Sequence, residues 1–180
     1  MIRSLRDEAF LLLEGHGAIL ETARDVGRIM SDAGIDGAII GGVAVVLHGY
    51  VRTTVDVDVF VNGPLKPLSE ALQENGFRFF SSRREFRRSA VPVHLVTKDQ
   101  TRMTPSAKER IEDVEVVSLP DLITMKLASG LREPLRAIDL ADVIGLIRAR
   151  RLTADFAARL SKEVRPEFRK LARAVVRQRR

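Results

Sequence analysis

The sequence predicts an α+β fold, in which strands come first along the chain and helices follow. Alternating and continuous apolar runs up to residue 117 are typical of strands, and helical periodicity takes over after Pro120. At 180 residues the chain can form one α/β core with a helical extension, but hardly two independent domains. We therefore expect a helical segment over 1–34 that packs on the core, an α/β core over 35–118, and a C-terminal helical region with a basic tail over 119–180.

The first expected element is an amphipathic helix over residues 19–33, because apolar residues recur there at helical spacing and Gly34 follows as a stop signal. Residues 37–40 form a short apolar run before Gly41 and Gly42, and 43–47 are apolar again. This order predicts a buried strand, a tight turn and a short buried helix.

Residues 55–61 alternate strictly, with four valines on one face and Asp56, Asp58 and Phe60 on the other. The pattern predicts a strand with one carboxylate-bearing face. The remaining periodicities predict the following elements: a helix at 65–75; strands at 77–81, 85–96 and 114–117; and helices at 122–129, 134–149, 154–162 and 166–178.

The charge of the chain is unevenly distributed. Thirty basic and 24 acidic residues give a formal charge of +6, but residues 148–180 alone hold 12 basic and three acidic residues, which leaves residues 1–147 slightly acidic. Such asymmetry indicates polyanion binding, and the alternative is a solvated, arginine-rich helical surface.

Composition also excludes several classes of function. The chain has no cysteine, which rules out disulfides, thiolate nucleophiles and cysteine-type zinc sites. It has no apolar run of about eighteen residues, and its start lacks the basic-then-apolar order of a secretory signal. We expect a cytoplasmic protein that does not bind membranes.

The most specific stretch joins the glycine pair to the two aspartates. Two aspartates two positions apart on a strand place their Cβ atoms about 6.5–7 Å apart on one side, so both carboxylates can hold one or two Mg²⁺ or Mn²⁺ ions. Gly41 and Gly42 at a strand end leave backbone N–H groups open to a phosphate. Each feature alone has an ordinary structural explanation, but aspartate is poor strand material, so a cation should compensate the pair.

This stretch resembles the nucleotidyltransferase superfamily, whose pattern is Gly-Gly, about a dozen residues, and Asp-x-Asp in a strand. Here Ile40-Gly41-Gly42 precedes thirteen residues and Asp56-Val57-Asp58. The chain is further similar to the AbiEii-type branch, which is associated with bacterial toxin–antitoxin and phage-defence systems. The residues that carry this similarity are Ala44, His48-Gly49, Arg52-Thr53, 119–126 and 136–143, and the resemblance covers roughly 35–147.

The resemblance implies a polymerase-beta-like fold, a small mixed sheet with flanking helices, and a set of roles. Gly41 and Gly42 would hold the nucleotide phosphates, Asp56 and Asp58 the metals, and Lys126 the triphosphate. Arg52 and Thr53 would line the same mouth, and Arg136 and Asp139 would complete the pocket, unless they form a surface pair. Lys126 has the alternative of extending along an apolar helix to solvent, and we expect His48 and Tyr50 to be packing or loop residues.

The superfamily usually places a third carboxylate on a neighbouring strand, where this chain has His94. Imidazole is a weaker Mg²⁺ ligand than carboxylate, but its pKa suits a general base. Either His94 is the base, or the protein is a nucleotide-binding scaffold, or the aligned strand is wrong and His94 is an ordinary strand residue.

Two functions from different classes follow. The first is an enzyme that transfers a nucleotide from an NTP to a hydroxyl acceptor, with tRNA or another RNA favoured over protein because of the basic tail. The alternative is a catalytically silent module that binds nucleotide or a cognate toxin or antitoxin; a basic RNA-binding platform is a third possibility. In the tail, Phe168, Leu171 and Val175 should face the core, and the RNA phosphates would contact Arg169, Lys170, Arg173 and Arg177.

Overall fold

The computed structural model describes residues 11, 16–101 and 103–178, so most of the expected N-terminal segment before residue 16 lies outside the described residues. Within them a seven-stranded sheet has the order β3-β4-β5-β2-β1-β7-β6. β1 pairs in parallel with β7 and β2 with β5, and the other neighbours are antiparallel. The predicted mixed sheet is therefore confirmed. The strands are β1 (Gly37–Ile40), β2 (Val57–Val61), β3 (Arg78–Phe80), β4 (Glu85–Arg87), β5 (Val93–Val96), β6 (Lys108–Ile111) and β7 (Val114–Val117).

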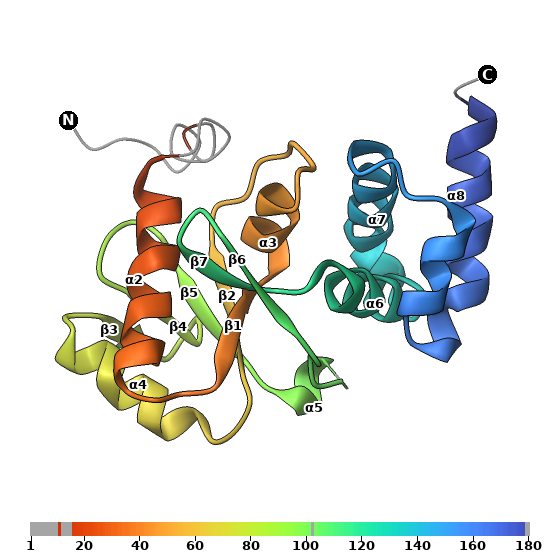
Figure 1. The fold of residues 1–180 in the computed structure, drawn as a ribbon. Coiled ribbons are helices and arrows are strands. Elements are labelled where there is room, and N and C mark those ends of the chain that lie inside the picture. The colour runs from red at the N-terminus through yellow and green to blue at the C-terminus, as the bar shows by residue number, and fades with distance from the viewer. Residues whose placement is uncertain (1–10, 12–15, 102, 179–180) are drawn as a thin grey trace.

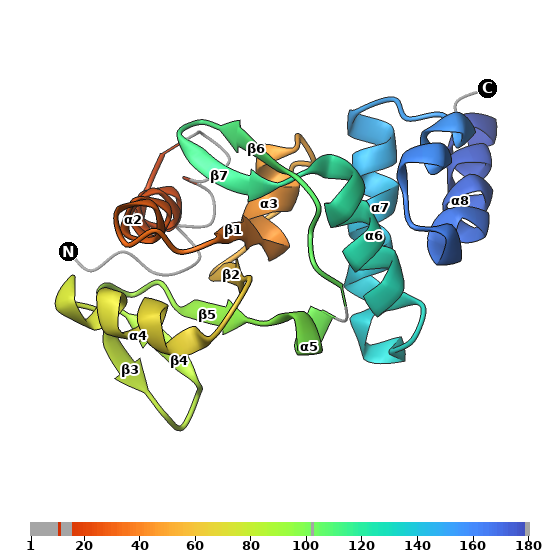
Figure 2. The same ribbon diagram turned by 60° about the horizontal axis from the view of Figure 1, so that its bottom comes forward.

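Helices flank the sheet and continue beyond it. α2 packs against α4 and several strands, whereas α6, α7 and α8 pack in succession at the other end of the molecule (Figures 1 and 2). α3 joins the two parts, because it contacts β1, β2 and α6. The α-helices are α2 (Ala18–Asp32), α3 (Gly41–Leu47), α4 (Leu65–Glu74), α5 (Lys98–Thr101), α6 (Leu119–Gly130), α7 (Ala137–Ala149) and α8 (Arg165–Gln178). The 3-10 helices are η1 (Pro134–Arg136), η2 (Ala154–Arg159) and η3 (Lys162–Val164).

One continuous apolar cluster holds these elements together. It includes Val26 of α2, Val59 of β2, Leu122 of α6 and Phe168 of α8, all fully buried. The C-terminal helices therefore share a core with the sheet. In the described part of the chain, no helix has the length and apolarity needed to cross a membrane.

Several expected elements differ from the structure. The strand expected at 55–61 begins at Val57, because Val55 is 43% exposed and Asp56 lies in a bend before the strand. The strand expected at 85–96 is two strands, β4 and β5, separated by residues 88–92, where Pro92 has no N–H for a ladder.

Other differences concern short elements. β6 was not predicted, since three of its four residues are charged and exposed, and it forms by pairing with β7. The helix expected at 154–162 is replaced by η2 and η3, and the helix expected at 134–149 opens with η1 before α7.

Candidate active site

Asp56, Asp58 and His94 meet on one face of the sheet. β2 and β5 are parallel neighbours in a register that places His94 beside Asp58, and Asp56 lies just before β2. His94 Nδ1 is 3.6 Å from Asp56 Oδ2 and 3.5 Å from Asp58 Oδ1. One ligand atom from each residue lies within 4.8 Å of the other two. The three side chains are thus spaced to bind a single cation.

The electrostatics of this cluster favour a positive charge. Burial raises the pKa of Asp56, and the neighbouring Asp58 carboxylate raises it further, although the Thr54 hydroxyl donates a hydrogen bond of 3.0 Å to Asp56 Oδ1. The pKa of His94 is raised, first by Asp58 and also by Asp56 and Glu85. Two carboxylates and an imidazole form a donor set that suits Mn²⁺ and, with a less favoured third ligand, Mg²⁺.

Glu85 is a fourth ionisable member of the cluster that the sequence analysis did not identify. Its Oε2 lies 3.5 Å from His94 Nε2, on the side of the ring away from the aspartates, and the residue is only 5% exposed. Burial alone would raise the pKa of Glu85, but Arg87, 2.7 Å from Oε1, and Arg83 outweigh it and lower the pKa. Glu85 therefore stays ionised beside the imidazole. In the sequence it is the first residue of the strand expected at 85–96, and nothing there marks it as part of a site.

The glycine pair allows other side chains to lie against the β1–α3 turn. Gly41 has φ +66°, and a Cβ atom there would be 2.0 Å from Asp58 Oδ2. A Cβ atom at Gly42 would be 2.3 Å from Thr54 Oγ1 and 2.9 Å from an Arg52 nitrogen. The two glycines are thus required by the packing of β2 and the segment before it.

A cavity of about 280 Å³ adjoins the cluster. It brings together residues that are far apart in the sequence, since its walls come from the β1–α3 turn, β2, the end of β5, α5, α6, η1 and the start of α7. Five of the predicted residues line it: Gly41, Asp58, Lys126, Arg136 and Asp139. Ser129 and Arg132 also line it and were not predicted. Gly42, Arg52 and Thr53 do not line it.

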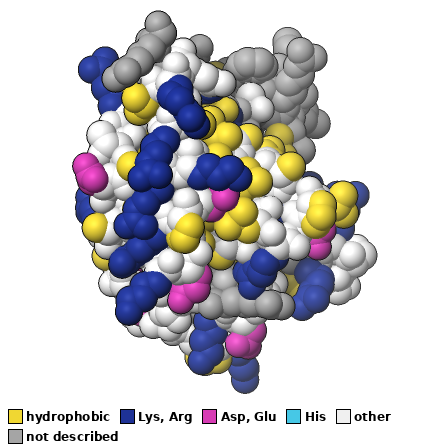
Figure 3. Space-filling view, turned by 90° about the vertical axis from the view of Figure 1, so that its right-hand side faces the viewer, with side chains coloured by type: hydrophobic (Ala, Val, Ile, Leu, Met, Phe, Trp, Pro, Cys, Tyr) yellow, Lys and Arg dark blue, Asp and Glu magenta, His cyan; other side chains and the backbone are white. Residues whose placement is uncertain are grey.

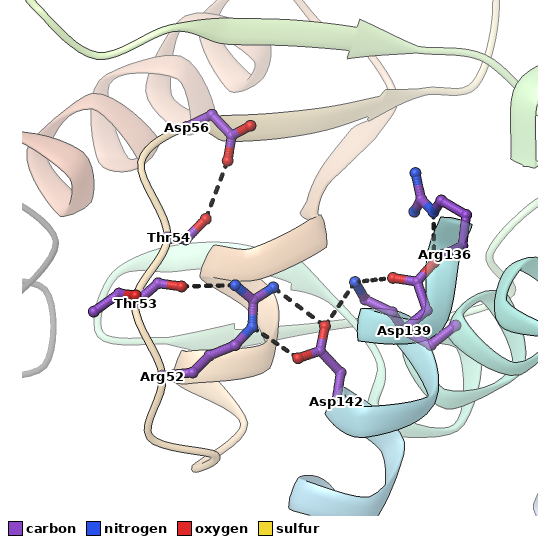
Figure 4. Close-up of polar contacts among 8 residues, drawn as sticks. Arg52, Thr53, Thr54, Asp56, Arg136, Asp139 and Asp142 are labelled. Atoms are coloured by element: carbon purple, nitrogen blue, oxygen red, sulfur yellow. Dashed lines mark hydrogen bonds and ion pairs between the residues drawn. The ribbon is translucent and has the colours of Figure 1, made fainter. Parts of the chain in front are cut away.

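A buried ionic network forms one wall of this cavity and extends behind it (Figure 4). Lys126 Nζ lies 2.7 Å from Asp139 Oδ1 and 2.9 Å from Asp142 Oδ2. Arg136 Nε donates to Asp139 Oδ2 at 2.8 Å, and Arg52 Nε lies 2.7 Å from Asp142 Oδ1. Three cations thus share two carboxylates that are almost fully buried. Burial would raise the pKa of Asp139, but Arg136 and Lys126 outweigh it and lower the pKa.

The network changes how several predicted residues are understood. Lys126 is buried between two carboxylates, so it does not extend to solvent, and its charge is largely compensated. Arg52 holds the segment before β2 against α7 through its ion pair with Asp142. It also donates a hydrogen bond of 2.7 Å to the backbone carbonyl oxygen of Thr53, a residue that is exposed. Asp142, which has no role in the sequence analysis, is the centre of this link.

The two residues expected to pack do so. His48 is buried with Nε2 2.8 Å from the Val117 carbonyl oxygen, and the Tyr50 ring lies against Gly145. On α8, Phe168 and Val175 are buried and Leu171 is half-buried, as predicted. Lys170, Arg173 and Arg177 are exposed and Arg169 is half-buried, and the face of the molecule at the α8 end carries a run of Lys and Arg side chains (Figure 3).

The fold and the Asp-x-Asp cluster beside a cationic cavity define a protein of the nucleotidyltransferase class. The chain belongs to the family described as "Nucleotidyltransferase of unknown function (DUF6036)", whose model matches residues 19–174.

An antigenic nucleotidyltransferase-like protein from Paracoccidioides brasiliensis is 18% identical with a TM-score of 0.55, covering 88% of this chain and 87% of that one. A tRNA-processing enzyme in its apo form I is 18% identical with a TM-score of 0.43, covering 73% of this chain and 42% of that one. No curated protein matches the chain. The first likeness supports the fold alone.

Proposed function

We propose that this protein is a metal-dependent nucleotidyltransferase that transfers a nucleotide from a nucleoside triphosphate to a hydroxyl acceptor. One observation carries the proposal: Asp58 belongs both to the Asp56–Asp58–His94 cluster and to the wall of a cavity lined by Arg132, Arg136 and Lys126. A polyanion bound in that cavity would meet the metal-binding residues at one end and cationic side chains at the other.

The cavity offers the triphosphate several contacts of different strength. Arg136 has a side chain that is 54% exposed and pairs with Asp139 through Nε only, so its remaining N–H groups can donate to phosphate oxygens. Gly41 has no side chain to keep a phosphate from the backbone. Lys126 supplies a fixed, partly compensated charge at the cavity wall.

Asp56 and Asp58 would hold Mg²⁺ or Mn²⁺, with His94 near enough to be a third ligand or a base. A divalent ion there would neutralise charge on the phosphates and make the acceptor hydroxyl more acidic. The acceptor oxygen forms a bond to the α-phosphorus while the bond to the bridging oxygen breaks, and pyrophosphate leaves. We assign the acceptor proton to His94 Nδ1, because this nitrogen faces Asp56 and Asp58 whereas Glu85 faces the other ring nitrogen.

The basic tail favours RNA, including tRNA, as the acceptor. The phosphate contacts would come from Arg169, Lys170, Arg173 and Arg177 of α8, at the end of the molecule away from β3 (Figure 1). The similarity to AbiEii-type proteins adds the proposal that the enzyme acts in a toxin–antitoxin or phage-defence system with a cognate partner protein.

A second candidate function is a catalytically silent module that binds nucleotide or such a partner. His94 favours it, because the histidine stands in the slot where the superfamily usually has a third carboxylate.

Thermal unfolding with and without NTP and metal tests the proposed site. A ligand that binds only the folded state stabilises it, by about 2.7 kcal/mol at a hundredfold excess over Kd. We expect NTP with Mg²⁺ or Mn²⁺ to raise Tm in the wild type and not in Asp56→Asn/Asp58→Asn. The matched control is Asp99→Asn/Asp113→Asn, which removes two exposed carboxylates. Equal shifts in the wild type and the Asp56/Asp58 variant would exclude the site.

A further inference from the structure

A second cavity borders His94. It has a volume of about 380 Å³ and is lined by His94, by Phe79 and Phe86 of the β3–β4 hairpin, and by Arg83 and Arg84 of the hairpin turn. It adjoins the first cavity, because Val96 and Gln100 line both. One member of the proposed metal site, Asp58, lines the first cavity and another, His94, lines the second, and the proposed function gives the second cavity no role.

The hairpin has an unusual composition for an edge of a sheet. Residues 78–88 contain five arginines and three phenylalanines, with Glu85 as the one acid. Glu85 is buried and its carboxylate lies 2.7 Å from Arg87, 3.5 Å from His94 and 4.0 Å from Arg83, so this one acid compensates the arginines of the turn only in part. The Arg83 side chain is 69% exposed, and Arg84 is exposed as well. The result is a positive turn at the mouth of the cavity.

The hairpin also presents aromatic surface next to this charge. Phe79 is 50% exposed, and its ring centroid lies 4.9 Å from that of the buried Phe86. The buried partner holds the Phe79 ring in place while leaving part of it open. Phe80, 45% exposed, follows on the opposite face of β3.

We propose that the β3–β4 hairpin and the cavity beside it bind the end of a single-stranded nucleic acid. An exposed aromatic ring on which a base can stack, beside arginines that contact the backbone, is the combination by which proteins hold single strands. Phe79 lies opposite Phe86 and Val93 in the sheet register, so its ring is on the face of the sheet away from His94. A strand end stacked on Phe79 would have to continue through the cavity, which both residues line, to bring its terminal hydroxyl to His94. The role of the bound strand as the acceptor of the transfer rests on the proposed function. Binding of the strand does not depend on that function.

This surface is distinct from the basic face of α8. β3 and α8 lie at opposite ends of the molecule in both ribbon views (Figures 1 and 2). A long RNA can contact both surfaces, whereas a short oligonucleotide on the hairpin cannot also reach α8. A short probe therefore cannot bridge the two surfaces, and variants of each surface show which one binds it.

The test measures binding of a labelled single-stranded oligoribonucleotide of about six nucleotides, a typical length for one site, by fluorescence anisotropy without NTP or metal. We expect Arg83→Gln/Arg84→Gln to weaken binding and to flatten the log–log salt dependence by about 1.4, because each phosphate that an arginine no longer neutralises reduces the slope by about 0.7. Phe79→Leu, which keeps an apolar side chain, should weaken binding by about fivefold or more with the slope unchanged.

The control Arg110→Gln/Arg151→Gln removes two exposed arginines outside the hairpin and should retain the wild-type affinity. Unchanged affinity in both hairpin variants, or loss only when the four basic residues of α8 are replaced by Gln, would overturn the proposal. An acidic peptide that displaces the probe and binds Phe79→Leu as tightly as the wild type would overturn it in favour of a protein ligand. If the hairpin variants retain the NTP-induced Tm shift, the nucleotide site is intact in them, and any loss of oligonucleotide binding is a property of the hairpin.

Discussion

Asp58 and Gly41 touch so closely that the glycine cannot change without moving the carboxylate. A Cβ atom at Gly41 would lie 2.0 Å from Asp58 Oδ2, and the backbone there has φ +66°. We expect Gly41→Ala to abolish the NTP-induced rise in Tm and to destabilise the protein by about 1 kcal/mol or more.

Gly27 provides the matched control for that substitution, because a Cβ atom in α2 at this position meets nothing within 4 Å. Gly27→Ala should raise Tm slightly, since alanine stabilises a helix by about 0.5–1 kcal/mol relative to glycine. Wild-type NTP-induced shifts in Gly41→Ala would contradict the role of the turn in placing Asp58.

Ionisation of the Asp56 carboxylate lowers the stability of the folded protein when no cation is bound. Its pKa is raised from the ordinary value of 3.8, first by burial and then by Asp58, so the folded state binds its proton more tightly than the unfolded state. This destabilisation is complete above the folded pKa and disappears as the pH falls towards 3.8.

We therefore expect Asp56→Asn to stabilise the metal-free protein by about 1 kcal/mol at neutral and alkaline pH. The advantage should shrink as the pH falls from the raised pKa towards the ordinary value. Urea unfolding in the presence of a chelator at several pH values measures it. If the free energy of unfolding of Asp56→Asn does not exceed that of the wild type at any pH, the electrostatic account is contradicted.

Among single residues, those that belong to a local pattern or to the family resemblance were predictable, and two that acquire their role only from spatial neighbours were not. The Gly41–Gly42 and Asp56–Asp58 pairs carry their spacing in the sequence. Glu85 and Asp142 were missed, because each acquires its role from partners on other elements, His94 for one and Arg52 and Lys126 for the other. Nothing around Glu85 distinguishes it from an exposed carboxylate, and Asp142 lies within the 136–143 stretch that carries the AbiEii-type similarity but received no role of its own.

At the scale of elements, Asp142 joins α7 to α6 and to the segment before β2. It accepts from Arg52 Nη2 at 3.2 Å and lies 2.9 Å from Lys126 Nζ, with its own side chain fully buried. Asp142→Ala would remove this buried carboxylate from both Arg52 and Lys126. We expect a loss of about 3 kcal/mol in the free energy of unfolding.

The comparison for that variant is Glu70→Ala, which breaks an exposed pair with Lys66 at 3.7 Å within α4 and should cost less than about 1 kcal/mol. The urea midpoint, read with an unchanged m value, measures both. Equal losses in the two variants would show that the buried network is not a stabilising link.

Periodicity predicted the elements that pack on the core and failed for those formed by pairing. α2, β1, β2 and α8 carry apolar residues at the expected spacing, and each lies within a residue or two of its predicted bounds. β6 has the charged residues Lys108, Glu109 and Arg110, and only its ladder with β7 makes it a strand. The β4–β5 break was likewise hidden, because Val91 and Val93 continue the apolar run across Pro92.

For the whole molecule, the decisive feature is that the sheet and the C-terminal helices both form the cavity. Gly41 and Asp58 come from the first part, and Lys126, Arg136 and Asp139 from the second. The resemblance named residues from both parts, but their meeting depends on how α6 and α7 pack against α3, which local pattern does not specify. A proposed boundary at residues 118–119 therefore divides the chain through the site.

The most direct measurement of the central claim is transfer of label from an NTP to RNA. Two labelled forms of the NTP, one on the α-phosphate and one on the γ-phosphate, distinguish nucleotide transfer from phosphate transfer. With Mg²⁺ or Mn²⁺ we expect the wild type to move the α-label into RNA and to release the γ-label in pyrophosphate. Asp58→Asn should reduce the rate by about 100-fold or more, because charge stabilisation at the metal site is lost. Equal α-label incorporation by the wild type and Asp58→Asn, or incorporation of the γ-label instead, would contradict the proposed reaction.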